Sequence, residues 1–563
     1  MVYDTVNIVV GGEAGQGLVT IGQILAKSLV RSGYSIVVTQ SYQSRIRGGH
    51  NTFAIRASAH NISAPQEVID LLVALDANTV KLHRQELAPQ GLIMADEASG
   101  VSDEACMNVP LKQLASDRYV NVAALGVVSE VLGLKEEVVA GSLRDLFGKG
   151  DPTAVKENRE ALRFGFQWGR EHALTNVELT PISDAPAPER MMLNGNEAIA
   201  LGAISAGLKF YSFYPMTPST SIGLSLASWA QQMGLIVEQA EDEIAAINMA
   251  LGASFAGAPS MVATSGGGFA LMVEGVSLAA MTETPVVIVV AQRPAPATGL
   301  PTRTEQGDLE FVLHAGHGEF PRAIFAPGSV EECFELTGKA FALADKYQGP
   351  IFLLTDQFLA DSYRAVAPFE LGRVSALRPG AAEGVAVSVP YGRYAVTDSG
   401  VSPRLLPGLT EHLVVADSDE HTEDGHITED LSVRVEMVNK RLRKGDGIRS
   451  ETVPPQWQGD DKPDLLIVCW GSSKGSVLEA AATLKSEGTQ VATLHFSQVW
   501  PLVPEQFLGR LEEARTVVCV ESNATGQLAG LIHRETGFRI EHPVHRYDGL
   551  PITPEYVLRV LRQ

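Results

Sequence analysis

Apolar runs alternate with amphipathic stretches along most of the chain. The pattern predicts a strand over residues 5–10, then a glycine turn and a helix over 18–31, where apolar residues recur at three- and four-residue spacing. In the middle of the chain, apolar runs at 261–264, 285–291 and 351–355 predict further strands, with helical patterns between them. Such alternation is typical of α/β domains with mostly parallel sheets that helices cover on both faces.

The same pattern resumes near the C-terminus after a break. Strands are expected at 464–470, 489–495 and 515–521, with a helix over 477–487. Residues 366–460 show no regular period, and prolines mark a linker before Met191. We therefore expect three α/β domains and two connecting segments, namely 1–178, the linker 179–190, 191–365, the irregular region 366–460 and 461–563.

The composition narrows the function classes. The 563 residues suffice for about three domains of ordinary size. A formal net charge of −22 would repel nucleic acid and anionic membranes, so we expect neither as a partner. The N-terminus lacks a basic n-region and the longest apolar runs are too short to cross a bilayer, so a cytoplasmic location is expected.

The cysteines are few and scattered. None belongs to a Cys-x-x-Cys pair, so we expect no disulfide framework, no metal site in this chain and a reducing compartment. Iron–sulfur clusters need several thiolates in spaced sets, so this chain alone should not hold one. Cys469 lies inside an expected strand, which indicates a small buried hydrophobic residue and not a nucleophile. The four are Cys106, Cys333, Cys469 and Cys519.

The glycine turn after the first strand lacks the dinucleotide-binding fingerprint. Its glycines follow the order Gly-x-x-Gly-x-Gly (12–17), and the second strand ends at Gln40, near where a ribose-binding acid would be expected. The sequence therefore gives little support to a nicotinamide-dependent dehydrogenase. Arg45 and Arg47, on a glycine-containing loop, could bind phosphate or carboxylate oxygens, and a solvated turn is the alternative.

Two charged clusters lie in the irregular region. His421 and His426 stand among carboxylates, but their spacing suits no strong metal-ligand template, so we expect a polar loop. Residues 440–444 form a basic run, Lys-Arg-Leu-Arg-Lys.

A proline-clamped turn is the most informative local feature. Between an apolar run and a helical pattern, residues 214–220 spell Tyr-Pro-Met-Thr-Pro-Ser-Thr. Pro218 disfavours the helical region at Thr217 and suits the first position of a helix, so we expect Thr217 to be the N-cap. A rigid hydroxyl beside open backbone N–H groups suits a bound anion, although an ordinary helix cap would have the same pattern.

Three acids begin the next expected helix. Glu243 directly precedes Ile-Ala-Ala, an apolar setting in which a carboxyl group can hold a shared proton. Glu241 and Asp242 fall on other faces of this helix and are expected to be capping or surface acids.

Taken together, these strings resemble the α subunit of the 2-oxoacid:ferredoxin oxidoreductases, thiamine-diphosphate enzymes that oxidatively decarboxylate a 2-oxoacid onto coenzyme A. The family's Tyr-Pro-Ile-Thr-Pro-Ser-Thr occurs here with Met216 for isoleucine. A departure is Pro-Ala-Pro-Ala-Thr-Gly (294–299), where many relatives have Gly-Gly-Pro-Ser-Thr-Gly. The other matching strings, in the family's order, are Glu-Asp-Glu (241–243), Gln-Arg (292–293), Leu-Pro-Thr (300–302), Thr-Glu-Gln (304–306) and His-Gly-Glu-Phe-Pro-Arg (317–322).

The resemblance covers nearly the whole chain. Residues 1–178 resemble the family's γ subunit, 191–365 its thiamine pyrimidine-binding domain, and 461–563 the C-terminal domain of transketolase-type enzymes. This fused layout is most similar to the branch that uses 2-oxoglutarate.

The resemblance also implies roles for individual residues. Glu243 would hold a proton toward the aminopyrimidine N1′ of thiamine, and Thr217 and Arg293 would act beside thiamine and substrate. Arg303 stands where the family places an arginine toward the carboxylate end of the substrate. The implied residues are catalytic Glu243, Thr217 and Arg293, cofactor-binding Tyr214, Pro215, Thr217 and Glu243, and substrate- or coenzyme A-binding Arg303, Arg45 and Arg47.

The resemblance finally implies a divided site and partners. No Gly-Asp-Gly…Asn-Asn motif for diphosphate and metal is present in the chain, so a β subunit would bring Mg²⁺ and a [4Fe–4S] cluster, in an (αβ)₂ assembly that reduces ferredoxin. The implied reaction converts 2-oxoglutarate, coenzyme A and oxidised ferredoxin to succinyl-coenzyme A, CO₂ and reduced ferredoxin, in either direction. The alternatives are an enzyme for pyruvate or a broad range of 2-oxoacids, and a non-catalytic scaffold subunit.

Overall fold

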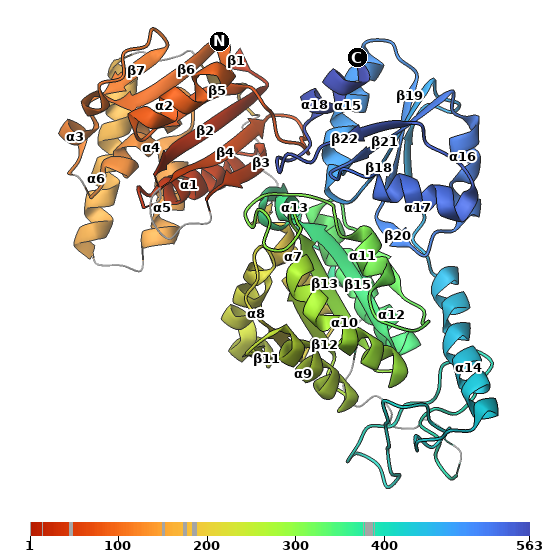
Figure 1. Cartoon of the computed structure of the whole chain (residues 1–563). Helices are drawn as coiled ribbons and strands as arrows, with labels where there is room; N and C mark the ends of the chain where they lie inside the picture. The colour runs from red at the N-terminus through yellow and green to blue at the C-terminus, as the bar shows by residue number, and fades with distance from the viewer. Residues whose placement is uncertain are drawn as a thin grey trace. The chain divides into compact units, whose positions relative to one another are not determined.

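The structure of the chain is a computed structural model that describes residues 2–13, 15–43, 49–116, 118–148, 152–172, 177–182, 189–374, 376–377, 387 and 389–563. The elements are drawn in Figure 1 and fall into two compact units. Unit 1 consists of Met1–Leu193, Asp361–Pro368 and Thr553–Arg559, and unit 2 of Asn194–Ala360, Phe369–Ile552 and Val560–Gln563.

Unit 1 is built on a mixed sheet. The strands from β7 to β2 are parallel, whereas β4 is antiparallel to β2 and β3, and β16 is antiparallel to β3 and β9. The expected strand, turn and helix at the start of the chain are confirmed, but β4 separates β2 from β3. In sheet order the strands are β7 (Cys106–Val109), β6 (Leu87–Asp96), β5 (Ile69–Ala74), β2 (Thr5–Glu13), β4 (His50–Ser58), β3 (Ser35–Ser41), β16 (Arg364–Val366) and β9 (Met191–Leu193).

The helices of unit 1 share one apolar core with this sheet. α1 contributes Ile21, Leu25 and Leu29, all buried, as its three- and four-residue spacing predicts. α4 and α6 approach closely, since a Cβ on Gly165 would come within 2.1 Å of a backbone oxygen of α4. The helices are α1 (Leu18–Arg31), α2 (Ala77–His83), α3 (Leu111–Leu114), α4 (Val120–Val131), α5 (Glu136–Phe147) and α6 (Pro152–Glu171), and β1 (Val2–Tyr3) pairs with β8 (Glu178–Leu179).

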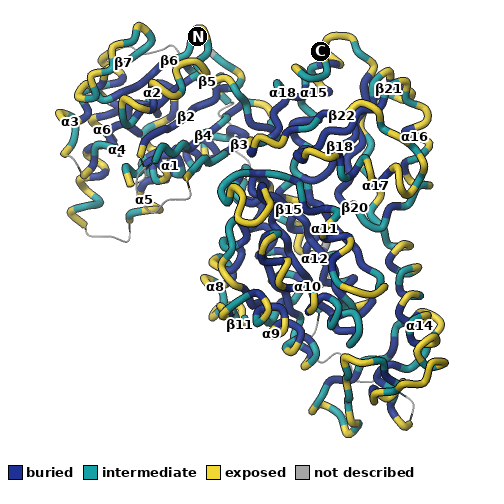
Figure 2. Tube along the Cα trace, in the orientation of Figure 1, coloured by how far each residue is buried: buried dark blue, intermediate teal, exposed yellow. Residues whose placement is uncertain are grey.

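Unit 2 contains a second sheet that is parallel except at one edge. The strands from β11 to β14 all pair in parallel, and β20 pairs antiparallel with β14. The central strands β12, β13 and β15 are buried along their whole length (Figure 2), which is typical of a parallel sheet with helices on both faces. In sheet order the strands are β11 (Ile236–Gln239), β10 (Phe210–Phe213), β12 (Ser260–Thr264), β13 (Val286–Gln292), β15 (Pro350–Asp356), β14 (Ala323–Phe325) and β20 (Gln498–Trp500).

The C-terminal part of unit 2 forms a third sheet. β18 pairs in parallel with β19 and β21, and β17 adds an antiparallel edge. Its buried residues belong to the same apolar core as those of the second sheet, for example Leu466 and Val262. The α/β fold class is thus confirmed. In sheet order the strands are β17 (Gln456–Gly459), β19 (Val491–Phe496), β18 (Leu465–Trp470), β21 (Thr516–Glu521) and β22 (His542–His545).

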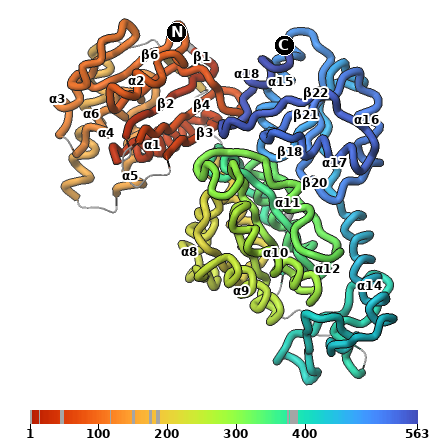
Figure 3. The backbone as a smooth tube through the Cα atoms, viewed as in Figure 1, coloured from red at the N-terminus to blue at the C-terminus, as the bar shows by residue number. Residues whose placement is uncertain are grey.

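Helices alternate with strands along the chain from β10 to β15. Figure 3 shows this part of the backbone in yellow to green, with α8 to α12 labelled. The helix expected over 477–487 is confirmed as α15, which begins three residues earlier and ends one residue earlier. The helices of unit 2 are α7 (Gly195–Ser205), α8 (Thr220–Met233), α9 (Glu243–Phe255), α10 (Gly266–Met281), α11 (Leu309–His314), α12 (Val330–Tyr347), α13 (Gln357–Asp361), α14 (Leu431–Ser450), α15 (Lys474–Ser486), α16 (Leu508–Glu513), α17 (Gln527–Thr536) and α18 (Pro554–Leu561), the last shared with unit 1.

The region without a periodic pattern contains the long helix α14. Its inner face is cationic, because Lys440 and Lys444 are buried and both pair with the fully buried Glu283, with 2.5 Å between Lys440 Nζ and Glu283 Oε1. Arg393 donates to the Glu283 carbonyl oxygen from the same cluster. These three cations hold the pKa of Glu283 low, at about 2, against the effect of burial. A hydrophobic pattern cannot reveal a helix whose inward side chains are charged.

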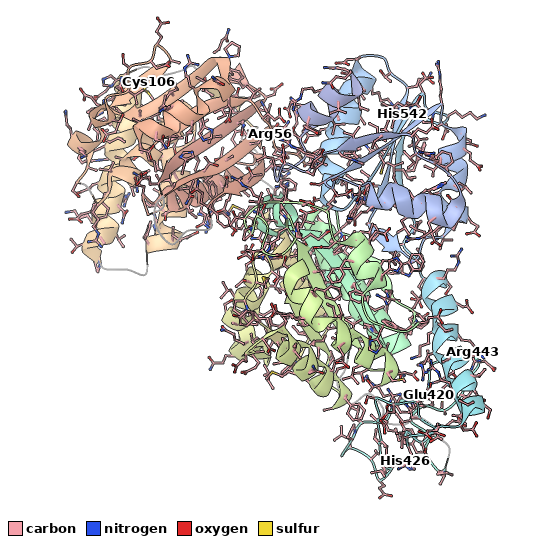
Figure 4. The ribbon with its side chains drawn as sticks, viewed as in Figure 1. Arg56, Cys106, Glu420, His426, Arg443 and His542 are labelled. Carbon is pink, nitrogen blue, oxygen red and sulfur yellow. The ribbon has the colours of Figure 1, made fainter. Side chains whose placement is uncertain are left out.

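The loop before α14 is held to that helix by a second ion cluster. Glu420, which is labelled in Figure 4, accepts from Nη1 and Nη2 of Arg441, at 3.0 and 2.9 Å, and also pairs with Arg434. His421 is buried against an aromatic ring while His426 is exposed, so the two histidines face different surroundings. Within the described residues, no group of three or more His, Cys, Asp or Glu side chains could hold a metal ion.

Candidate active site

Three strands of the second sheet end side by side at the candidate site, because the sheet order is β10-β12-β13. β10 leads into the turn 214–219, β12 into the glycine-rich start of α10, and β13 into Arg293. The strands are parallel, so their carboxyl ends lie at the same edge, where open α/β sheets bind ligands. The fold thus brings together motifs that are far apart in the sequence.

The turn after β10 is tied to the end of β13. Arg293 Nη1 donates a hydrogen bond of 2.7 Å to the carbonyl oxygen of Thr217. Helix α8 begins only at Thr220, with Ser219 at the N-cap position, so the expectation that Thr217 caps this helix is wrong. The reason is that a turn precedes the helix, which places Pro218 outside it and not at its first position.

Glu243 is the first residue of α9 and its carboxyl group is buried. Only 3% of the residue is exposed, and Oε1 has no hydrogen-bond partner among the residues that the structure describes. Asp242 is the cap of this helix, since its carboxylate accepts from the backbone N–H of Ala245 at 2.7 Å, which confirms the expected capping role. A buried carboxyl oxygen without a partner is costly, and such groups in native proteins commonly face a ligand or water.

Gly268 leaves space beside this carboxyl group. A Cβ on Gly268 would come within 2.4 Å of Glu243 Oε1 and 2.2 Å of Thr264 Oγ1. Any larger residue at this position would therefore displace the acid, which gives the glycine-rich start of α10 a steric reason.

A second acid, Asp308, lies near Arg293. Both residues are mostly buried, at 8% and 9% exposed, and burial raises the pKa of Asp308 to about 6 while the Arg293 charge opposes that rise. Burial correspondingly lowers the pKa of Arg293. The Asp308 backbone N–H donates to Gln292 Oε1 at 2.9 Å, and a Cβ on Gly266 would lie 2.5 Å from Asp308 Oδ2. Arg293 therefore acts in a confined space beside an acid and is not a solvated charge at a strand end.

Asp308 is a site residue that the sequence pattern alone does not reveal. It occupies the N-cap position of α11, where an aspartate is commonplace, but its side chain makes no capping hydrogen bond. Only its position directly after the string Thr-Glu-Gln-Gly (304–307) could have drawn attention to it.

The remaining expected site residues differ in how they are placed. Tyr214 is 39% exposed and Pro215 is also exposed, whereas Arg303 is half-buried. Arg45 and Arg47 lie outside the described residues.

Helices α8, α9 and α10 contain almost no charged residues. α8 contains no charged residue, α9 only the buried Glu243, and α10 only Glu274. Large apolar side chains are exposed on the three helices, among them Leu224, Ile244 and Leu271. α9 and α10 pack against each other, whereas α8 packs against α7. Exposed apolar side chains on α9 and α10, beside the buried Glu243, indicate a protein interface.

The cysteines are consistent with structural roles. Cys469 is 1% exposed, as expected for a small buried hydrophobic residue, and burial raises its pKa to about 12. Cys333 and Cys519 are also buried, and burial raises the pKa of both thiols. Among the residues that the structure describes, no helix is both long and apolar enough to span a membrane.

Two family models match the chain. One, described as "Pyruvate flavodoxin/ferredoxin oxidoreductase, thiamine diP-bdg", matches residues 201–440. The other, described as "Pyruvate ferredoxin/flavodoxin oxidoreductase", matches residues 7–168. The first match includes the edge of the sheet at which Thr217, Glu243, Arg293 and Asp308 lie.

Similar proteins are found along the whole length. A 2-oxoacid:ferredoxin oxidoreductase subunit alpha from Sulfolobus sp is 31% identical, over 96% of this chain and 94% of that protein. The 2-oxoglutarate oxidoreductase subunit KorA from Mycobacterium tuberculosis is 29% identical, over 93% of this chain and 87% of that protein. A solved structure of 2-oxoglutarate:ferredoxin oxidoreductase from Magnetococcus marinus, with 2-oxoglutarate, coenzyme A and succinyl-CoA bound, has a TM-score of 0.92 and 31% identity, covering 100% of this chain and 99% of that chain.

Proposed function

Because this chain belongs, as an α subunit, to the family of 2-oxoacid:ferredoxin oxidoreductases, we propose that it acts on 2-oxoglutarate and contributes one half of a thiamine diphosphate site. The reaction would convert 2-oxoglutarate, coenzyme A and oxidised ferredoxin to succinyl-coenzyme A, CO₂ and reduced ferredoxin, or run in reverse. Support for this substrate comes from the KorA relatives and from the similar structure that holds 2-oxoglutarate and succinyl-CoA.

The single observation that supports the cofactor half-site best is the Oε1 atom of Glu243. In the described part of the chain it is buried without a hydrogen-bond partner, and Gly268 lets it lie close against the start of α10. A nitrogen of a bound aminopyrimidine would supply the missing hydrogen-bond partner. When bound, thiamine diphosphate supplies the nucleophilic carbon and the electron sink that decarboxylation of a 2-oxoacid needs. Glu243 would hold a proton at Oε1 for the pyrimidine ring, and Tyr214, Pro215 and Thr217 would line the same side of the cofactor.

The two arginines are proposed to bind the 2-oxoacid. Arg293 uses Nη1 on the Thr217 carbonyl, which orients the rest of its guanidinium group. A guanidinium group can bind a carboxylate through two parallel hydrogen bonds, and in a site with little water such bonds are strong. Arg303 would bind the substrate through such a pair, with Arg293 near the oxygen at which charge develops.

A β subunit is proposed to complete the site. It would cover the nearly uncharged surface of α9 and α10 and bring the diphosphate-binding residues, Mg²⁺ and a [4Fe–4S] cluster, in an (αβ)₂ assembly that reduces ferredoxin. The exposed apolar side chains of that surface support a protein partner there. Arg45 and Arg47 in unit 1 are proposed to bind coenzyme A, whose phosphates match guanidinium groups.

The test is co-purification of this chain with its β subunit from the native cell, followed by steady-state kinetics with 2-oxoglutarate, pyruvate and 2-oxobutyrate and a viologen acceptor. We expect 2-oxoglutarate to have the highest kcat/KM by at least about tenfold, a difference of about 1.4 kcal/mol. Equal kcat/KM for pyruvate would favour the broad-range alternative.

The scaffold alternative predicts something different. If this chain only supported its partner, Glu243→Gln would leave turnover intact in an assembled complex, whereas loss of turnover would reject a scaffold role. Purified alone, the chain should be colourless, because its thiols are too scattered for a cluster. A stoichiometric [4Fe–4S] absorption in the purified single chain would show that this chain holds the cluster, and would contradict its assignment to the β subunit.

A further inference from the structure

The segment 303–308 runs across the ends of strands from two different sheets. Its residues alternate between buried and half-buried positions, as in an extended chain. Thr304, Gln306 and Asp308 are buried, at 3%, 0% and 8% exposed, while Arg303 and Glu305 are half-buried. Arg303 therefore lies on the opposite side of the segment from the residues that hold it in place.

Two of the buried residues are attached to the second sheet. Thr304 Oγ1 donates to Asp356 Oδ1 at 3.2 Å, at the last residue of β15, and accepts from the backbone N–H of Phe358 at 3.2 Å. The Asp308 N–H donates to Gln292, the last residue of β13. These contacts determine how the segment lies on the thiamine-binding domain.

Gln306 is attached to the third sheet, at the ends of β18 and β21. Its Nε2 donates to the carbonyl oxygen of Trp470 at 2.9 Å, and its Oε1 accepts from the backbone N–H of Ser522 at 2.9 Å. Its own N–H donates to the Ser522 carbonyl at 2.6 Å, and its carbonyl accepts from Asn523 Nδ2 at 3.1 Å. A fully buried amide with partners on both ends has one orientation, because any rotation leaves a buried polar group unpaired.

The same sheet also supports the segment directly beside the arginine. The N–H of Thr304 donates to the carbonyl oxygen of Gly549 at 3.2 Å. Gly549 has a φ of +84°, and a Cβ on it would come within 3.1 Å of the Arg303 Cβ. Arg303 thus packs on the loop after β22 at a point where only glycine fits without strain.

From these contacts we infer that Gln306 is a positioning residue, through which the C-terminal sheet holds Arg303 in the orientation that binds the 2-oxoacid. The inference rests on the proposed role of Arg303 and adds to it a role for the C-terminal domain in substrate binding. A core made only of apolar residues could bury the segment equally well, but it would not determine the direction in which Arg303 leaves it.

The test is a double-mutant cycle between Gln306 and Arg303 in the complex with its β subunit. Gln306→Glu keeps the acceptor for the Ser522 N–H but removes the donor to Trp470. A carboxylate oxygen of the new side chain would then face the carbonyl oxygen of Trp470. We expect kcat/KM for 2-oxoglutarate to fall by about tenfold to a hundredfold, mainly through KM, as for a misplaced binding group. In the Arg303→Ala background the same change should have almost no further effect.

Gln498→Glu is a matched control. Gln498 is also buried, and its side chain makes the same two kinds of hydrogen bond, from Nε2 to the carbonyl oxygen of Trp500 at 3.0 Å and to Oε1 from the N–H of Val453 at 2.9 Å. Because its hydrogen bonds match those of Gln306, Gln498→Glu should lower stability about as much as Gln306→Glu does. Gln498 lies on β20 and not in the segment 303–308, so KM should stay unchanged.

The outcomes distinguish the positioning role of Gln306 from the substrate-binding role of Arg303. Equal losses from Gln306→Glu with and without Arg303 would mean a purely structural role and would overturn the inference, while the function of Arg303 stands. No loss in Arg303→Ala alone would overturn the proposed role of Arg303 and the inference with it. If Gln306→Glu does not assemble, the cycle is measured with Gln306→Met, which has a similar shape and no charge, and the same criteria apply.

Discussion

Arg293 donates a hydrogen bond from Nη1 to the backbone carbonyl of Thr217, a residue 76 positions earlier in the chain. This bond joins the end of β13 to the proline-containing turn after β10, although β12 lies between the two strands. One side of Arg293 is thereby used to hold the turn, and Asp308 lies near it in the same confined space. The guanidinium group is therefore preorganised before any substrate arrives.

Glu243→Gln should abolish cofactor activation without preventing assembly. A carboxamide cannot release and recover the proton that the pyrimidine ring needs, while binding of the diphosphate to the partner would remain. The measurement is hydrogen–deuterium exchange at C2 of the bound thiamine, with assembly checked by gel filtration. Glu505→Gln, at an acid whose side chain is 75% exposed, is the control and should exchange normally. Normal exchange in Glu243→Gln would refute its role.

Arg303→Ala should cost about 2–4 kcal/mol of transition-state stabilisation, the size of effect seen when one preorganised donor is removed. Arg303→Lys should recover little, because an ammonium group cannot make the two-point bond. The measurement is kcat/KM for 2-oxoglutarate at confirmed thiamine occupancy, with Arg515→Ala as an exposed control whose side chain is 82% accessible. A loss of kcat/KM smaller than about threefold would contradict a role of Arg303 in substrate binding.

Asp308→Asn should change how stability depends on pH. Burial raises the folded-state pKa of Asp308 from 3.8 to about 6, so its contribution is present at low pH and is lost as the pH rises through about 6. Above that pH the wild type contains a buried carboxylate that asparagine replaces with a neutral group. Asp308→Asn should therefore gain up to about 3 kcal/mol relative to wild type as the pH rises from about 3 to 7, with most of the change between the unfolded pKa of 3.8 and the folded pKa of about 6.

This gain is measured by thermal unfolding across that pH range. Asp464→Asn is the control, since the Asp464 side chain is 54% exposed and its ion-pair distance to Arg515 is 3.7 Å. A difference between Asp308→Asn and wild type that does not vary with pH would show that Asp308 stays in one protonation state.

Glu283→Gln should destabilise the attachment of α14 by about 3–5 kcal/mol, because it leaves three buried cations without their anion. Lys440→Met should cost less, since Glu283 keeps its pairing with Lys444 and its neighbour Arg393. Denaturant unfolding monitored by intrinsic fluorescence gives both values. Glu487→Gln removes an exposed ion pair and should change stability by less than about 1 kcal/mol. If Glu283→Gln and Glu487→Gln changed the free energy of unfolding equally, the buried ion cluster would not be what holds α14 in place.

Much of the fold follows from local patterns. α1 has the expected bounds, and the strands β12, β13 and β15 differ from expectation by one or two residues. These elements have strong apolar periodicity and are bounded by glycine or proline, so local sequence suffices to define them. Helix α14 was missed because its inward residues Lys440 and Lys444 look like surface charges until their partner Glu283, far away in the sequence, is known.

By itself, the sequence determined the family, the α/β class and the candidate residues Glu243, Thr217 and Arg293. It could do so because short strings of unusual composition form local turns and helix starts. Only the tertiary structure decided that Thr217 precedes the helix cap, that Asp308 lies buried near Arg293, and that Gln306 holds its segment to a different sheet. These last relationships depend on where the ends of non-adjacent strands meet. Sheet order and burial set those positions, and neither leaves a signature in the neighbouring residues.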